Sequence, residues 1–572
     1  MKEAQLEMLR IICQRVCDEL QEKDTGVPVS DPLLWLLHGS PGTGKSEVLK
    51  YVKELFVDVL GWQMGLEYHM VALQAVMAEL LEGDTIHHAC GINPFGPSTD
   101  ASSAQKASQR QADVAKRVLQ WRWLFIDEIS MVGAKLLAEV EMKLRSIMSD
   151  VGTMKRGKHG FIHAFGGINI VFSGDFWQLD PPKGSFLADI PTEFLRRARV
   201  FDPKPDVAHG QAIFWGSGKG TVQGVTELTE CVRTEDPWLL QVQNEMRAGA
   251  LSLDSSNFLH GRPTTVPGSW VDGSCACGKP ECATSWTERK EECRKCQVER
   301  QGKHRVMNTP GDERHRTEHF VGAPAIFPNN DIKCEVNKLR AQIFAAETRQ
   351  AITWSIAKDK PSNRVIAEKE NLVEEKQQWL KRHDRDCGSL YGTLPLAVGS
   401  PMVLTDHYNR NPKVQLLRGR IGYVQSWILD KREDSEYEGD VRYLRYPPKA
   451  VLMKFYEWVK EDEELVQRPC KWHLDGMSEP GVYPIKPWPR SWFLDQRRDI
   501  PQLKVTRWQL PLGPAFAITA HGSQGQTLIA CINDLQIGRG VSPVASYTSM
   551  TRIRTRHDLL IFRDFDPAIF TQ

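Results

Sequence analysis

The sequence has 572 residues, of which 41% are hydrophobic and 25% are charged. These values are ordinary for a soluble globular protein, and the length allows about three or four domains. Lysine and arginine together number 73 against 72 for aspartate and glutamate, so composition alone gives no support for a nucleic-acid partner, and any polyanion site must be a local groove.

The cysteines and the N-terminus indicate a compartment. Most of the 13 cysteines stand alone in the sequence, which is typical of a reducing intracellular environment. No apolar run reaches the length of about 18 residues that a membrane span needs. Acidic residues near the start, Glu3, Glu7, Asp18 and Glu19, argue against a signal or transit peptide. Functional sequence begins almost at Met1, so the chain also fits a fragment of a longer protein.

A glycine-rich loop stands between an apolar run at 33–37 and a helix-like segment at 47–60. The loop reads G-x-x-x-x-G-K-S, and strand, loop and helix together predict a phosphate site for a nucleoside triphosphate. Glycines let backbone N–H groups approach the phosphates, and the following helix N-terminus favours negative charge. The residues expected to hold the nucleotide are Gly39, Gly42, Thr43, Gly44, Lys45 and Ser46. Lys45 would reach the β and γ phosphates, and the Ser46 hydroxyl would bind Mg²⁺.

Strands and helices alternate through the first 225 residues. An amphipathic helix and a polar loop occupy 1–31, and further strands are predicted at 69–73, 121–126 and 168–172. A helical period covers 132–148. The stretch 92–115 is rich in Ser, Ala and Gln and is predicted to be a mobile surface excursion. This alternation predicts an α/β fold with a parallel sheet and ligands at the strand carboxyl ends.

The second part of the chain returns to an α/β pattern at 323–327, 331–347 and 515–562. Two insertions interrupt it. One, at about 262–320, is polar and rich in cysteine. The other, at about 395–505, alternates short apolar segments with Gly and Pro turns, which predicts a small β barrel.

Carboxylates and an amide follow two of the predicted strands. Asp127 and Glu128 end the strand at 121–126; Asp127 suits a second Mg²⁺ contact and Glu128 a general base for the attacking water. Gln178 follows the strand at 168–172 and could position that water or sense the γ-phosphate. Its neighbours Phe176 and Trp177 could stack on a base or pack in the core.

These motifs, in this order, resemble motifs I, II and III of superfamily-one DNA helicases. The closest branch is the Pif/RecD-like family, which includes helicase domains of Helitron-type transposons. Later stretches agree with motifs Ia, IV, V and VI: 74–75 with 83–87, 228–249, 517–527 and 547–552. The resemblance covers nearly the whole chain except the cysteine-rich insertion.

The resemblance implies two RecA-like domains with ATP in the cleft between them. The first would span 1–225, and the second 226–394 and 506–572, with an SH3-like insertion at 395–505. Arg233 and Arg552 would act as arginine fingers that neutralise charge in the transition state. The family's adenine-reading glutamine would be Gln5, and Gly525 would lie at the nucleotide.

The resemblance also implies contacts with single-stranded DNA. The side chains at the family's DNA-contact positions carry hydroxyl, imidazole and amide groups, which suit sugar-phosphate contacts. The residues at the family's DNA-contact positions are Thr85, His87, His521, Ser523 and Gln524. Family members translocate 5′ to 3′, a polarity that the residues themselves do not reveal.

A cysteine cluster in the first insertion predicts a structural Zn²⁺ site, because paired cysteines at short spacing suit tetrahedral zinc. The alternative is a loop with free thiols. The cluster consists of Cys275, Cys277, Cys282, Cys293 and Cys296.

The sequence is therefore interpreted as an ATP-dependent DNA helicase that uses ATP and Mg²⁺. Its partners would be single-stranded and forked DNA, with no membrane and a monomeric state, and its location the nucleus or mitochondrion by family analogy. Roles in replication, repair, recombination or telomere maintenance follow from the same analogy. Three alternatives stay open: an RNA-directed helicase, an ATP-switched component of a transposition machine, and a degenerate copy.

Overall fold

The computed structural model describes residues 2–93, 101–150, 163–182, 184–190, 205–216, 218, 220–260, 317–369, 371–411, 413–461, 464–496, 498, 501–538 and 542–571. Residue contacts divide the chain into two compact units. Unit 1 comprises Met1–Met307, Ser523–Ile529 and Ser542–Gln572, and unit 2 comprises Asn308–Gly522 and Ala530–Val541. Each unit is described by itself. Among the described residues, none of the helices is both long enough and apolar enough to cross a membrane.

Unit 1 is built on a six-stranded sheet in the order β3-β2-β4-β5-β1-β6. Every neighbouring pair in it is parallel, which confirms the predicted α/β parallel sheet. Its strands are β1 (Leu34–Gly39), β2 (Tyr68–Ala72), β3 (Asp84–Thr85), β4 (Trp123–Asp127), β5 (Asn169–Gly174) and β6 (Gly224–Leu228). The short strand β23 (Leu559–Ile561) also belongs to this unit.

The four inner strands of this sheet, β2, β4, β5 and β1, are buried at consecutive positions because helices cover both faces. Alternate residues of β4 point to opposite faces: Leu124 and Ile126 join one core cluster, whereas Trp123 and Phe125 join the other. The helices of the unit are α1 (Glu3–Thr25), α2 (Lys45–Glu54), α3 (Ala75–Leu80), α4 (Ile86–Ala89), α5 (Ala101–Val118), α6 (Ala134–Asp150), α8 (Pro205–Trp215), α9 (Pro237–Ala248), α10 (Leu253–Leu259) and α16 (Pro543–Met550).

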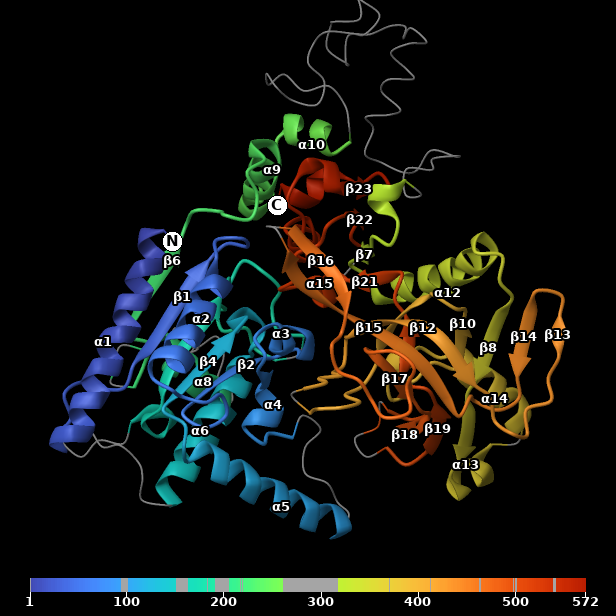
Figure 1. The fold of residues 1–572 in the computed structure, drawn as a ribbon, viewed down its shortest axis with the longest axis horizontal. Coiled ribbons are helices and arrows are strands. Elements are labelled where there is room, and N and C mark those ends of the chain that lie inside the picture. The colour runs from blue at the N-terminus through green and yellow to red at the C-terminus, as the bar shows by residue number, and fades with distance from the viewer. Residues whose placement is uncertain are drawn as a thin grey trace, which may run out of the picture. The chain divides into compact units, whose positions relative to one another are not determined.

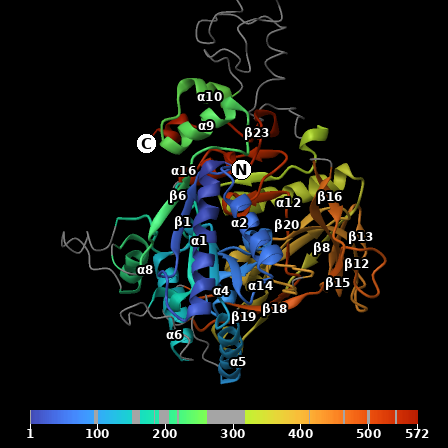
Figure 2. The same cartoon turned by 60° about the vertical axis from the view of Figure 1, so that its left-hand side comes forward.

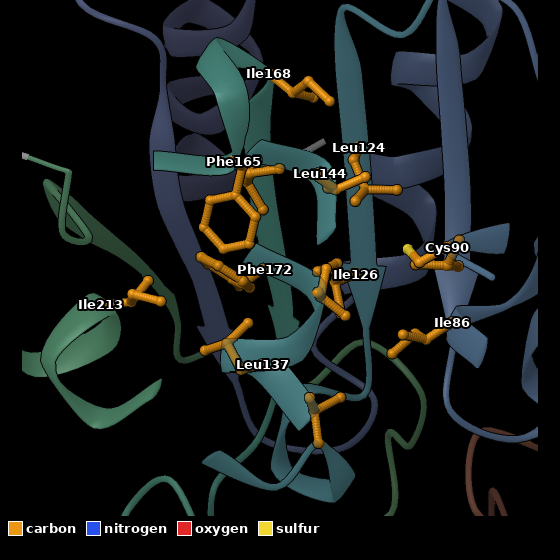
Figure 3. Close-up of a cluster of buried hydrophobic side chains, with 14 of the residues drawn as sticks. Ile86, Cys90, Leu124, Ile126, Leu137, Leu144, Phe165, Ile168, Phe172 and Ile213 are labelled. Atoms are coloured by element: carbon orange, nitrogen blue, oxygen red, sulfur yellow. The ribbon is translucent and has the colours of Figure 1, made fainter. Parts of the chain in front are cut away.

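One face of the sheet packs on α4, α5, α6 and α8, and Figure 3 shows the side chains of this core. Phe172 of β5 lies against Phe165 and Phe214, with ring centroids 6.3 Å and 5.3 Å away. The other face packs on α1 and α2, which run beside each other (Figure 2). Full burial of one such large apolar side chain contributes about 1.5–3 kcal/mol.

The stretch predicted as a mobile excursion at 92–115 includes most of helix α5. Val114 and Val118, near the end of α5, are buried in the core beneath the sheet. Alanine and glutamine are good helix formers, so a composition that resembles a low-complexity loop also suits this helix. Residues 94–100 lie outside the described residues.

Unit 2 contains four sheets. The parallel neighbours β21-β7-β22 form one, and α12 packs on it. The others have the orders β10-β8-β14-β13, β18-β19-β9 and β16-β15-β12-β11-β20, with β17 paired to β15. Figure 1 labels most of these elements. The strands are β7 (Ala325–Phe327), β8 (Ile352–Ile356), β9 (Lys358–Pro361), β10 (Thr393–Leu396), β11 (Pro401–Leu404), β12 (Ile421–Ile428), β13 (Tyr437–Glu438), β14 (Val441–Leu444), β15 (Ala450–Glu461), β16 (Glu464–Pro469), β17 (Val482–Ile485), β18 (Trp488–Phe493), β19 (Lys504–Gln509), β20 (Leu512–Pro514), β21 (Ala517–Thr519) and β22 (Cys531–Asn533). The helices are α12 (Asn330–Glu347), α13 (Asn363–Glu368), α14 (Leu372–Lys381) and α15 (Ala520–Ser523).

The apolar segments between 395 and 505 form antiparallel strands, with β11, β12 and β15 as neighbours. Strand pairing also crosses the ends of this range, because β8 pairs with β14, and β11 pairs with β20. The SH3-like insertion and the domain boundaries at 225, 394 and 505 stay predictions.

Candidate functional site

The glycine-rich loop lies where the sequence placed it, between β1 and α2. Its backbone needs glycine at Gly42 and Gly44, whose φ angles are 81° and 86°. The Lys45 ammonium donates to the carbonyl oxygens of Gly39 and Ser40, at 2.6 Å and 3.1 Å. Burial lowers the pKa of Lys45, and the carboxylates of Glu128, Asp175 and Asp127 oppose that shift.

The end of β4 brings two carboxylates to this loop. Burial, and then the neighbouring Glu128 charge, raises the pKa of Asp127 to about 6. Glu128 has a left-handed backbone, with φ at 53° and ψ at 50°, and its side chain is buried. Such a conformation is uncommon for a residue other than glycine and is often found at functional sites.

The segment at 523–525 contacts the Glu128 side chain. The Gln524 amide donates to a Glu128 carboxylate oxygen at 2.9 Å. A Cβ added to Gly525 would lie 3.7 Å from the other oxygen of Glu128. Residues almost 400 positions apart in the chain therefore meet at one carboxylate, and both lie in unit 1.

Two arginines complete this part of unit 1. Arg552 is 1% exposed and donates to the carbonyl oxygen of Thr548 at 2.8 Å and to the Gln178 amide oxygen at 3.3 Å. Burial, and then the Arg233 charge, lowers the pKa of Arg552 to about 9, whereas Glu128 opposes this shift. Arg233 donates to the carbonyl oxygen of Thr551 at 2.6 Å, and burial lowers its pKa as well.

The site thus gathers three cations, one buried and two half-buried, whose charged forms are disfavoured by burial. A bound polyanion would offset that cost, because opposite charges are strongly attracted where water is excluded. The arrangement suits the phosphates of a nucleotide at the end of the glycine-rich loop. The cations are Lys45, Arg233 and Arg552.

Gln5 lies against the same loop from α1. Its amide nitrogen donates to the carbonyl oxygen of Thr43 at 3.2 Å, and its oxygen accepts from the backbone N–H of Lys2 at 2.8 Å. A Cβ on Gly44 would lie 2.3 Å from the Gln5 amide nitrogen. The glycine at 44 is therefore needed for this contact as well as for its backbone angle.

The oxygen donors of the site fit Mg²⁺. Ser46 lies in the first turn of α2, and Asp127 is the last residue of β4. Their hydroxyl and carboxylate groups are the hard oxygen ligands that Mg²⁺ prefers. A divalent cation would also balance the negative charge that raises the Asp127 pKa.

The residues predicted to contact DNA are found in several places. Thr85 and His87 lie at the β3–α4 junction, and burial lowers the pKa of His87. Ser523 and Gln524 are buried in unit 1, and Gln524 bonds Glu128. His521 is half-buried and belongs to unit 2. The five cysteines of the predicted zinc cluster lie outside the described residues, so that site stays a prediction.

Sequence reasoning did not assign a role to Asp175 and Arg247. Asp175 follows β5 and has no exposed surface, and the Arg247 guanidinium of α9 grips both its oxygens, at 2.5 Å and 2.8 Å. Arg247 also donates to the Tyr547 hydroxyl at 3.1 Å. Both residues stand inside recognised motifs, but their pairing across 72 positions has no sequence signal.

The aromatic pair after β5 divides between core and surface. Phe176 packs edge-on against Phe214, with ring centroids 5.4 Å apart. Trp177 is 60% exposed, with the Arg247 guanidinium 5.8 Å from its ring centroid. Of the two, Trp177 has the accessible face that base stacking needs.

Comparison with known proteins agrees with this geometry. Residues 22–185 match the family model described as PIF1-like helicase. The chain is 24% identical to the ATP-dependent DNA helicase PIF1 of Emericella nidulans, over 92% of this chain and 58% of that protein. It is 27% identical to the Xenopus laevis protein of the same name, over 93% of this chain and 59% of that protein. The chain therefore spans less than two thirds of the length of these curated relatives.

Solved structures show the same fold. The crystal structure of Pif1 helicase from Candida albicans has a TM-score of 0.56 and 18% identity, with 100% of this chain and 96% of that chain covered. The Pif1 helicase from Bacteroides, in complex with ADP-AlF3 and single-stranded DNA, has a TM-score of 0.50 and 16% identity, with 99% and 94% covered. These similarities support a RecA-like α/β fold.

Proposed function

We propose that this chain, which carries a PIF1-like helicase domain over residues 22–185, is an ATP-dependent DNA helicase that moves along single-stranded DNA. The observation that carries the proposal is the meeting of the glycine-rich loop, a buried carboxylate and two arginines inside unit 1. Its relatives are named ATP-dependent DNA helicases, and a neighbour of the same fold holds both ADP-AlF3 and single-stranded DNA.

The nucleotide would lie along the loop from Gly39 to Ser46. Lys45 would leave its two carbonyl partners and bind the β and γ phosphates. Ser46 and Asp127 would hold Mg²⁺, which supplies positive charge at the phosphates. Gln5, whose amide nitrogen donates to the Thr43 carbonyl oxygen, would lie beside the adenine base of ATP.

Glu128 would accept a proton from the attacking water, and Gln178 would orient that water. Arg233 and Arg552 would stabilise the charge that grows on the transferred phosphoryl group. Glu128 is held by Gln524, which belongs to the segment with DNA-contact positions. Binding of a DNA strand near Ser523 and Gln524 would therefore alter the position of the Glu128 carboxylate, the proposed general base.

The substrates inferred from the resemblance are single-stranded and forked DNA, with Thr85, His87, His521, Ser523 and Gln524 as contacts and 5′ to 3′ movement. A structure of Pif1 helicases on forked double-stranded DNA shares the fold, with a TM-score of 0.51. A nuclear or mitochondrial location, and roles in replication, repair, recombination or telomere maintenance, are inferred from the family alone.

The decisive measurement is ATP hydrolysis with and without single-stranded DNA, for wild type, Glu128→Gln and the control Glu7→Gln, which changes an exposed carboxylate on α1. We expect DNA to stimulate the wild type and the control equally. Glu128→Gln should lower kcat by about 10²–10⁴-fold, the usual contribution of a general base.

Strand separation on duplexes with a 5′ or a 3′ tail then tests direction. The proposal predicts unwinding from the 5′ tail only. Hydrolysis that ignores DNA, or that Glu128→Gln leaves intact, would contradict it. Stimulation by RNA but not by DNA would instead identify an RNA-directed motor.

A further inference from the structure

A second group of side chains of metal-binding types lies in unit 2. None of its residues has a role in the proposed helicase function. Cys334, His383 and Asp384 place one ligand atom each within 4.8 Å of the others. Cys334 is buried, and His383 and Asp384 are each 15% exposed at the side chain. Asp331, one turn before Cys334 on α12, points its carboxylate at the same histidine.

Three separations among these atoms are close to those between ligands of a tetrahedral zinc ion. The Cys334 sulfur lies 3.3 Å from the His383 Nε2 and 3.7 Å from the Asp384 Oδ1. The His383 Nε2 lies 3.5 Å from the Asp331 Oδ1. Zinc bonds of about 2.3 Å to sulfur and about 2.0–2.2 Å to nitrogen and oxygen put neighbouring ligands about 3.4–3.6 Å apart.

The other ring nitrogen of His383, Nδ1, has a carboxylate oxygen beside it. His383 Nδ1 lies 3.0 Å from the Asp384 Oδ1, a carboxylate oxygen that can accept its N–H. A metal-bound histidine ordinarily has such a partner, which fixes its ring. The backbone N–H of Arg385 points to the same nitrogen at 3.1 Å, but it is a donor and is not a partner of this kind. Asp384 Oδ1 therefore orients the ring, and a bond from Asp384 to the ion would use its other carboxylate oxygen.

We propose that Asp331, Cys334, His383 and Asp384 form a zinc site that ties the start of α12 to the segment before β10. A thiolate, an imidazole and carboxylates are a donor set that zinc accepts, and calcium and magnesium select against sulfur. The site is structural: it joins two segments 49 residues apart in the chain, and because it forms only in the folded state, zinc binding adds to the free energy of unfolding.

The chain has a further cysteine cluster that could hold zinc, so the test removes it first. In a background with Cys275, Cys277, Cys282, Cys293 and Cys296 all changed to Ser, the purified protein should retain about one zinc ion per chain. His383→Gln or Cys334→Ser in that background should release it. The control Cys387→Ser removes a buried cysteine that packs in another cluster and should keep the ion.

Cobalt gives a second readout that does not depend on stability. Co²⁺ added to the stripped background should produce a sulfur-to-metal absorption band that Cys334→Ser abolishes and Cys387→Ser retains. Asp331→Asn changes an exposed side chain and should weaken metal binding without unfolding the protein. A background free of zinc and without the cobalt band, or equal zinc in His383→Gln, would overturn the proposal. Neither result bears on the helicase, whose test is hydrolysis.

Discussion

At the scale of single residues, the proposed nucleotide site combines cations and acids whose ionised forms are disfavoured by burial. Lys45, Arg233 and Arg552 are cations with pKa values lowered by burial, and Asp127 is an acid whose pKa burial raises to about 6. For each of these groups, the ionised form is unfavourable unless an opposite charge lies close to it. Such opposed shifts in one place are typical of sites built to bind and transform a charged ligand.

The raised pKa of Asp127 predicts a pH-dependent effect on stability. The folded protein binds this proton more tightly than the unfolded chain does. Ionisation of the carboxyl therefore lowers the free energy of unfolding progressively as pH rises from about 4 to 6, and by its full amount above that range. Asp127→Asn should therefore raise the melting temperature of the nucleotide-free protein, and more at pH 8 than at pH 5. Thermal denaturation at both values checks this, with Asp58→Asn, an exposed carboxylate, as the control. An equal rise at both values would contradict it.

At the scale of elements, α9 is fixed to the sheet and to the C-terminal helix by polar side chains. Its N-cap, Asp236, accepts from the backbone nitrogens of Trp238 and Leu239 and pairs with Arg556. Gln243 donates to the carbonyl oxygen of Met550, and Arg247 grips Asp175. The helix thus connects the end of β5 with the residues that precede Arg552.

Arg247→Ala should be strongly destabilising, because it removes the arginine that pairs with both oxygens of the buried Asp175 carboxylate. Loss of one member of a buried ion pair costs about 3–5 kcal/mol. The double variant Arg247→Ala with Asp175→Asn should recover part of this, and denaturant unfolding measures both. The control Arg10→Ala breaks an exposed pair with Glu3 and should change the unfolding free energy by less than about 1 kcal/mol. A double variant less stable than Arg247→Ala would count against the pairing argument.

The elements that bear local signals could be predicted from the sequence. The glycine-rich loop needs one stretch of chain, and the carboxylates of Asp127 and Glu128 follow an apolar strand whose parallel neighbours end at the same edge. The Gln524–Glu128 and Arg247–Asp175 contacts could not be predicted, because tertiary packing alone joins residues so distant in sequence. The helix at 101–118 was missed since its composition suits a loop as well.

At the scale of the whole molecule, unit 1 is assembled from three separate stretches of chain. The glycine-rich loop and Glu128 come from the first stretch, Gln524 from the second and Arg552 from the third. Unit 2 occupies most of the sequence between the first and last of these. The proposed catalytic site therefore exists only when the end of the chain has folded back onto its beginning.

Nucleotide binding should consequently protect segments that are remote in sequence. With Mg²⁺ and a nonhydrolysable ATP analogue, amide hydrogen exchange should slow at 39–46, at 523–529 and at 551–553, because ligand binding stabilises the closed local structure. Strand β17, at 482–485 in unit 2, serves as the internal control and should not change. Lys45→Ala should lose protection in all three segments. Protection confined to 39–46 would show that the later segments do not respond to the ligand.

The left-handed backbone of Glu128 bears on any attempt to improve this protein by laboratory selection. Its φ of 53° costs a glutamate about 1 kcal/mol, a penalty that glycine or asparagine largely escapes. Either replacement removes the carboxylate proposed to activate water. A screen that rewards only heat resistance would thus favour chains that no longer turn over ATP, so libraries of this protein need to be sorted on turnover as well.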